Sequence, residues 1–108
     1  MGDNGPSVDD LFAELRVAYA ASLPAQIDLL AACVGRGHTD PGARKEAIVR
    51  AHRLLGTAGT YGLPAVSDAA AVLERALEAT PPSDADIDTA LRTLQDAAAR
   101  ITASTTRS

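Results

Sequence analysis

The chain has 108 residues, which is enough for one domain with its own hydrophobic core and too few for a second domain. Its net charge is −4 and Lys45 is its only lysine, whereas a nucleic-acid surface needs clustered Lys or Arg to contact phosphates, so we expect no nucleic-acid partner. Alanine and leucine dominate, only three residues are aromatic, and β-branched residues do not alternate in runs, so the composition predicts an all-α fold.

The sequence predicts a soluble cytoplasmic protein that does not contact a membrane. No apolar run approaches the roughly 20 residues that span a bilayer. The acidic segment 1–10 lacks the basic and apolar regions of a signal peptide. The lone Cys33 cannot form a disulfide within the chain and lies in an apolar run, so we expect a buried thiol in a reducing compartment.

The first predicted helix follows a leader, residues 1–7, which is rich in Gly, Pro, Asp and Asn and is expected to be flexible. Ser7 is suited to cap the helix, with Asp10 three residues later completing a capping box. Pro24 lies inside the helical pattern, so we expect a kink, or a break with a new cap at Ser22. An apolar stripe continues across the proline at steps of three or four residues: Leu11, Leu15, Tyr19, Leu23, Ile27, Leu30 and Val34.

Three further helices are predicted after the polar segment 35–42. The second runs from about Pro41 to Tyr61, the third starts at Leu63, and the fourth follows Ser83, which can act as its N-cap. Four helices with short connections are typical of an up-and-down bundle, which we place at residues 8–102. The segment 103–108 carries no apolar periodicity and is expected to be a disordered tail.

The second helix contains "RAHRLLGTAGTYGLP", residues 50–64, in which one histidine is followed by three glycines. Each glycine costs a helix interior about 1 kcal/mol relative to alanine, so their presence needs a reason. A helical wheel places His52 nearly opposite the core face and therefore in solvent. The residues on that core face are Ala47, Ala51, Leu54, Ala58 and Tyr61.

The outward face around His52 is aliphatic and glycine-rich instead of charged. An apolar surface of this kind is a liability unless another protein covers it, so the pattern predicts a docking surface. Gly56, one turn after the histidine, leaves clearance beside the imidazole, whereas Gly62 follows the last core residue and is suited to a left-handed cap. The predicted docking residues are Ile48, Val49, Leu55, Gly56 and Gly59.

Other functional interpretations of these residues have less support. A phosphate-cradling glycine loop requires a preceding strand and a Lys followed by Ser or Thr, and the sequence has neither. A metal site built from Cys33, His38 and His52 lacks recognisable ligand spacing. His38, in a polar loop, is expected to be a surface residue without a role.

The region around His52 resembles the signature of histidine-containing phosphotransfer (HPt) domains. That signature is a small or apolar residue, His, any residue, Leu, usually Lys or Arg, Gly, Ser or Thr, and then small residues to a second Gly. The resemblance extends over residues 8 to 101, including the segment that ends at Glu74. The matching positions are Ala51, His52, Leu54, Gly56, Thr57, Ala58 and Gly62.

This resemblance implies a four-helix bundle that carries a phosphoryl group between receiver domains of response regulators, or from a hybrid histidine kinase to a receiver. It implies that His52 is the phosphorylated residue. A neutral imidazole is a competent nucleophile at cytoplasmic pH. No cofactor or metal of its own and no independent kinase activity are implied, because the receiver domain would supply the Mg²⁺ site.

One position departs from the family pattern. Leu55 stands where most members carry a Lys or Arg that helps to hold the phosphoryl group, and a missing cation weakens electrostatic stabilisation of the transition state. Arg53 is the candidate for a partial replacement, although it lies about 100° around the helix.

Three hypotheses follow. The first is a phosphorelay carrier. The second is a pseudo-HPt adaptor that docks a receiver or kinase without carrying phosphate. The third, with less support, is a dimerisation module in which a second copy covers the apolar face of the second helix; we expect a monomer.

Overall fold

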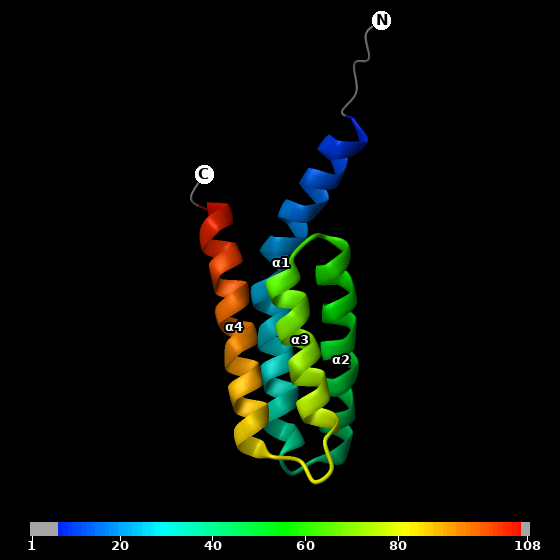
Figure 1. The fold of residues 1–108 in the computed structure, drawn as a ribbon, viewed down its shortest axis with the longest axis vertical. Helices are drawn as coiled ribbons and strands as arrows, with labels where there is room; N and C mark the ends of the chain where they lie inside the picture. The colour runs from blue at the N-terminus through cyan, green and yellow to red at the C-terminus, as the bar shows by residue number, and fades with distance from the viewer. Residues whose placement is uncertain (1–6, 107–108) are drawn as a thin grey trace, which may run out of the picture.

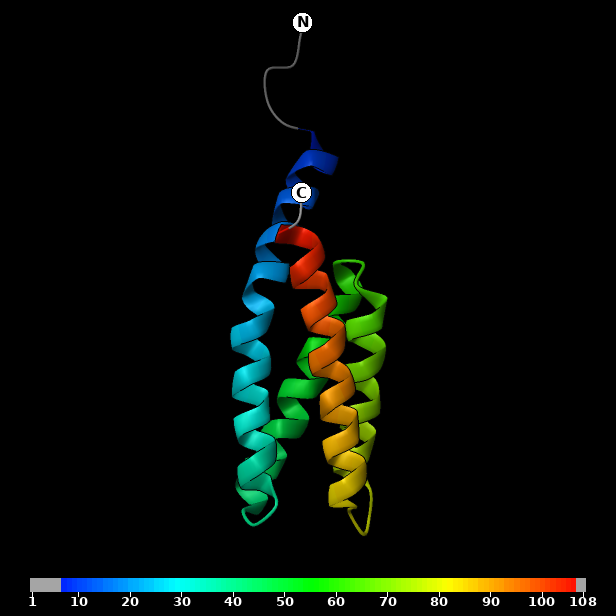
Figure 2. The ribbon, with the colours of Figure 1, turned by 90° about the vertical axis from the view of Figure 1, so that its left-hand side faces the viewer.

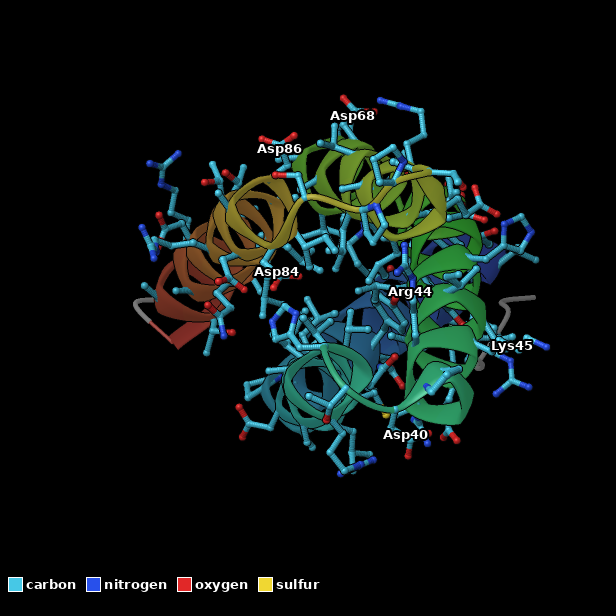
Figure 3. The ribbon with its side chains drawn as sticks, turned by 90° about the horizontal axis from the view of Figure 1, so that it is seen from below. Asp40, Arg44, Lys45, Asp68, Asp84 and Asp86 are labelled. Carbon is cyan, nitrogen blue, oxygen red and sulfur yellow. The ribbon has the colours of Figure 1, made fainter. Side chains whose placement is uncertain are left out.

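The computed structural model describes residues 7–106, with side chains up to residue 103. Its four helices are α1 (Val8–Gly37), α2 (Pro41–Thr60), α3 (Pro64–Glu78) and α4 (Asp84–Thr106). Successive helices run in opposite directions (Figure 1), and an end view shows them arranged in a ring in which α1 is adjacent to α4 (Figure 3). The predicted all-α, up-and-down four-helix bundle is confirmed, and no strand occurs within the described part of the chain.

The helix caps form where the sequence predicts them. Ser7 Oγ accepts a hydrogen bond from the Asp10 backbone N–H at 3.0 Å, and the Asp10 carboxylate accepts one from the Ser7 N–H, which completes the capping box. Ser83 Oγ accepts from the N–H of Asp86 at the start of α4. Gly62 adopts φ +70°, the left-handed conformation in which glycine commonly ends a helix.

The helix α1 is continuous through Pro24, so the predicted break with a new cap at Ser22 is wrong, and the predicted kink is not confirmed. The Ser22 hydroxyl donates to the Tyr19 carbonyl at 2.6 Å and accepts from Gln26, so it bonds inside the helix. Proline removes one backbone donor, but burial of the neighbouring Leu23 favours continuation of the helix.

The N-terminal part of α1 projects beyond the α2–α3 turn and beyond the end of α4 (Figure 1). The predicted apolar stripe therefore meets the core only from Tyr19 onward, and its first two members, Leu11 and Leu15, are 47% and 53% exposed. The bundle ends at the α2–α3 turn, where the rings of Phe12 and Tyr19 stack on Tyr61. Burial raises the pKa of the Tyr19 phenol, while its hydrogen bond to Thr57 acts in the opposite direction.

The core lies between the four helices and is aliphatic. Cys33 is 3% exposed, which confirms the predicted buried thiol. The side of α2 that faces the core consists mainly of alanines, and their small side chains allow neighbouring helices to approach closely. The largest fully buried side chains are Leu23, Leu30, Leu73, Leu77, Leu94 and Val66.

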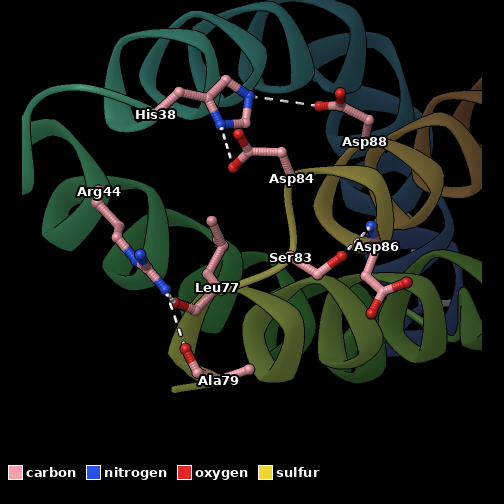
Figure 4. Close-up of polar contacts among 8 residues, drawn as sticks. All are labelled: His38, Arg44, Leu77, Ala79, Ser83, Asp84, Asp86 and Asp88. Carbon is pink, nitrogen blue, oxygen red and sulfur yellow. Dashed lines mark hydrogen bonds and ion pairs between the residues drawn. The ribbon is translucent and has the colours of Figure 1, made fainter. Parts of the chain in front are cut away.

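Polar contacts hold the helices together at the lower end of the bundle (Figure 4). His38 Nδ1 lies 2.9 Å from Asp84 Oδ1 and its Nε2 lies 3.4 Å from Asp88 Oδ1, so the histidine joins the end of α1 to the start of α4. His38 was expected to have no role, and these contacts give it a structural one. Arg44 of α2 donates to the carbonyls of Leu77 and Ala79 at the end of α3.

Two sequence-based expectations differ from the structure. The helix α4 continues to Thr106, into the segment 103–108 that was expected to be a disordered tail; residues 107–108, like residues 1–6 of the expected leader, lie outside the described part. In addition, α1 is long and apolar enough to cross a membrane by length and composition, although no such segment was expected. A third of its apolar window is buried in the bundle, and the core helices of soluble proteins pass the same test.

Candidate functional site

His52 lies near the middle of α2 on the side directed away from the core. Its side chain is 71% exposed, whereas Ala51 and Leu54, its neighbours on the opposite side of the helix, are 0% and 3% exposed. The three-residue and four-residue spacing of the small and apolar core residues fixes this orientation, as the helical wheel predicts. The imidazole is therefore accessible to a partner protein while the helix that carries it is firmly packed.

Glu74 of α3 holds the imidazole of His52. Its Oε2 and Oε1 lie 3.0 and 3.2 Å from His52 Nδ1, and its side chain is only 17% exposed. An ionised carboxylate accepts hydrogen bonds and cannot donate them, so Nδ1 carries the proton in this contact. In the neutral imidazole, the lone pair then resides on Nε2.

Sequence reasoning did not identify Glu74 as a partner of His52. The available signal was the register of the α2–α3 hairpin, because His52 and Glu74 are equally far from Leu63 along the chain. In two antiparallel helices joined by a short turn, residues equidistant from the turn lie at the same height. This register places a carboxylate beside the histidine.

The predicted docking residues divide into two groups. Val49 is 48% exposed and available on the surface. Ile48 and Leu55 are half-buried and pack against the core, so only part of each side chain is on the outer face. The apolar surface around His52 is therefore smaller than the wheel suggests.

The two glycines of this face have different surroundings. A Cβ atom added at Gly56 would meet nothing within 4 Å, so the surface beside His52 is open, as expected for clearance. A Cβ atom at Gly59 would lie 3.4 Å from Ser67 Oγ, and that hydroxyl donates to the Leu55 carbonyl at 2.8 Å. Gly59 thus serves the close approach of α2 and α3, as well as bordering the outer face.

The cations near His52 lie on the flank opposite Glu74. Arg53 is exposed on the α1 side of α2, where it lines a small groove together with Gln26 and Arg50. Arg50 Nε donates a hydrogen bond to Glu46 Oε2 at 2.9 Å, and this bond is the main reason why the pKa of the Arg50 guanidinium is raised. The structure does not bring Arg53 into contact with His52 within the described residues.

The arrangement is chemically simple. It presents one nucleophilic nitrogen, one carboxylate that orients the ring, and an open surface beside them. Within the described residues, no group of three or more His, Cys, Asp or Glu side chains is placed to hold a metal ion. The site therefore combines an exposed nucleophilic group with a carboxylate that fixes its orientation.

Of three comparisons with known proteins, one finds a match. No curated protein and no solved structure matches the chain in the corresponding comparisons. The family model described as the Hpt domain matches residues 8–103, which include α1, α2, α3 and nearly all of α4. The chain therefore belongs to the Hpt domain family, whose members act with receiver domains and histidine kinases in the phosphorelays of two-component signalling.

Proposed function

We propose that this chain is a phosphorelay intermediate in which His52 accepts a phosphoryl group and passes it on. The donor is a kinase or the phosphorylated aspartate of a receiver domain, and the acceptor is the aspartate of another receiver domain. The observation that carries this proposal is the exposed imidazole whose Nδ1 is held by Glu74. Soluble proteins are typical of the family, and we place this chain in the cytoplasm, where such partners act.

In the proposed step, the Nε2 lone pair of His52 attacks the phosphorus of the aspartyl phosphate. A new N–P bond forms, the P–O bond to the aspartate breaks, and the carboxylate leaves with the bonding electron pair. Glu74 keeps the Nδ1 proton in place and stabilises the positive charge that develops on the ring. The reverse sequence returns the phosphoryl group to a receiver.

The partner supplies what the chain lacks. We propose that Mg²⁺ is held by the acidic site of the receiver domain and neutralises the charge on the transferring group there. This chain contributes no cofactor of its own. The receiver docks over Val49 and the open surface at Gly56, with the exposed edges of Ile48 and Leu55 completing the contact. Arg53 extends this surface on its α1 side.

Replacement of Glu74 by Ala should slow phosphoryl transfer to His52 without preventing it. A hydrogen bond to a charged group is worth about 1.5–3 kcal/mol, which corresponds to a loss of about tenfold to a hundredfold in rate. The rate is measured by quenched-flow transfer from a phosphorylated receiver domain. Glu74→Gln is the matched control, because its amide oxygen can still accept a hydrogen bond from Nδ1–H and should recover part of the rate. An unchanged rate in Glu74→Ala would contradict the orienting role.

Replacement of Leu55 by Lys should increase the transfer rate or the lifetime of the phosphohistidine several-fold, because it adds a cation on the outer face near the phosphoryl group. Leu55 is half-buried, so the aliphatic part of a lysine can keep its packing while the ammonium reaches solvent. Leu55→Met is the control that keeps the apolar contact and adds no charge. Equal rates and lifetimes in the two variants would show that the missing cation has no effect.

Leu55 is also the observation that favours the second candidate function, a pseudo-HPt adaptor that docks a receiver or kinase without carrying phosphate. The two candidates share a docking surface and differ in chemistry. They are therefore distinguished by the fate of the phosphoryl group and not by binding alone.

The deciding experiment incubates the purified chain with Mg²⁺ and several receiver domains that have been phosphorylated by a small phosphodonor. Mass spectrometry follows phosphate that is acid-labile and base-stable, as a phosphohistidine is. The relay proposal expects this phosphate on His52. Binding of a receiver without any phosphate on the chain would instead establish the adaptor.

A further inference from the structure

The outer side of α1 is an apolar surface that no other helix covers. Figure 2 shows α1 at one edge of the bundle, and it packs only against α2 and α4. Large side chains on its outer side are open to solvent: Val8 is 81% exposed, and Leu11, Leu15 and Leu29 are about half exposed. This surface includes the projecting turns and continues along the bundle, and it lies on a different helix from His52.

The spacing on this surface is that of a coiled-coil seam. Its members follow one another at alternating steps of four and three residues, which is a repeat of 3.5 residues that matches the a and d positions of a heptad. They are distinct from the residues by which α1 packs into the bundle, such as Leu23 and Ile27. The residues of the seam are Leu11, Leu15, Ala18, Ser22, Ala25 and Leu29.

The seam can be buried at low cost in free energy. None of its residues is charged, and all of them are exposed. Its single polar member is Ser22, whose hydroxyl already donates to the Tyr19 carbonyl and accepts from Gln26. Covering this serine therefore leaves no hydrogen-bonding group without a partner.

We propose that two copies of this chain associate in parallel through this seam on α1. The heptad spacing requires a helical occupant with the same repeat, and a second copy offers that repeat in the matching register. The small residues Ala18, Ser22 and Ala25 lie in the middle of the seam and allow close approach of the two helices, while Leu11, Leu15 and Leu29 supply apolar area towards the ends. The sequence-based expectation of a monomer did not consider this surface, because Leu11 and Leu15 were assigned to the stripe that faces the core.

The charges beside the seam determine the orientation. Glu14 and Asp28 lie on one edge of it, at equivalent heptad positions. The other edge carries Gln26 and is bordered by Arg50 and Arg53 of α2, which line a groove with that glutamine. Arg50 is paired with Glu46 of its own helix, so Arg53 supplies the net positive charge of this edge. A parallel pair places the acidic edge of each copy against the basic edge of the other, whereas an antiparallel pair places the two acidic edges together. His52, Val49 and Gly56 are not part of the seam or of its edges in this arrangement.

The first test measures the mass of the full chain by sedimentation equilibrium over about a hundredfold range of concentration, because a reversible dimer dissociates on dilution. The wild-type chain should approach twice its mass of 11.1 kDa at high concentration. Leu15→Glu should remain a monomer with the same helix content. Val17→Glu is the matched control, because Val17 is 55% exposed against 53% for Leu15 and lies off the seam. It should dimerise like the wild type.

A wild-type chain that is monomeric at every concentration would overturn the proposal, and so would equal disruption by Leu15→Glu and Val17→Glu. If the monomeric chain instead floats with vesicles of mixed zwitterionic and anionic lipid, the surface binds lipid and the proposal fails. None of these results depends on phosphoryl transfer, so failure here is separate from failure of the relay proposal.

The second test addresses orientation by oxidative cross-linking. In a parallel seam, position 18 faces position 18 of the other copy, so Ala18→Cys alone should form a disulfide-linked dimer. The wild type is the control, because its Cys33 is buried and should not cross-link. A mixture of Ala18→Cys and Ser22→Cys chains that cross-links while Ala18→Cys alone does not would overturn the parallel arrangement.

Discussion

Replacement of His52 by Gln should abolish phosphoryl transfer to the chain and leave the helical bundle intact. Glutamine keeps a polar group that can contact Glu74, but it has no nitrogen with an available lone pair. Because the His52 side chain is 71% exposed, its replacement removes little packing. Mass spectrometry should find no phosphate on the variant. Its free energy of unfolding should lie within about 0.5 kcal/mol of the wild type, as is usual for exposed positions.

The control for this variant is His38→Gln, which changes the only other histidine. His38 follows α1 and contacts Asp84 and Asp88 of α4 at the lower end of the bundle, whereas His52 lies near the middle of α2. The loss of His38 should therefore leave phosphoryl acceptance unchanged. Phosphate on a His52→Gln chain would refute the assignment of the acceptor. Unfolding of that variant would instead refute the orientation of α2.

Replacement of Leu54 by Ala should lower the free energy of unfolding by about 2–5 kcal/mol, because it removes buried methyl groups and leaves a cavity. Leu54 is 3% exposed and is the one large core residue of α2, whose other buried positions are alanines. The neighbouring helices cannot collapse onto the vacated space without shifting, so the loss should lie in the upper part of this range. Chemical denaturation followed by circular dichroism gives the value.

Val49→Ala provides the comparison for that measurement. Val49 is 48% exposed on the same helix, and its truncation should change the free energy of unfolding by less than about 0.5 kcal/mol. A loss below 1 kcal/mol in Leu54→Ala would mean that α2 does not present this side to the core. The proposed direction of His52 would then have to be abandoned too.

The sequence predicts α2 well, because its core residues follow one helical period without interruption. Ala47, Ala51, Leu54 and Ala58 are all buried, and His52 is exposed, as the wheel requires. Tyr61, also predicted on the core face, is instead half-buried in the aromatic stack at the α2–α3 turn. Local signals were equally reliable at Ser7, Ser83 and Gly62, where a side-chain oxygen or a positive φ decides how a helix starts or ends. Such features depend on a few neighbouring residues, so one sequence is enough to identify them.

Features that depend on neighbouring helices were not predictable in the same way. The stripe that includes Leu11 and Leu15 has helical periodicity, but periodicity does not say where the adjacent helices end. Because α1 extends beyond its neighbours, these two leucines are exposed. The contact of Glu74 with His52 depends on the register of α2 against α3. Pro24 is a strong local signal for a break, yet burial of the residues around it outweighs that signal.

The aromatic stack at the α2–α3 turn makes the protein its own optical reporter. The chain has no tryptophan, and both of its tyrosines, Tyr19 and Tyr61, lie in this stack with ring centroids 4.8 Å apart. All of its near-ultraviolet fluorescence from tyrosine therefore originates at one end of the bundle, where α1 leaves the other helices. Undocking of the turns that carry Phe12 should change this emission, whereas melting of the helices changes the circular dichroism, so the two processes can be followed separately without an added label.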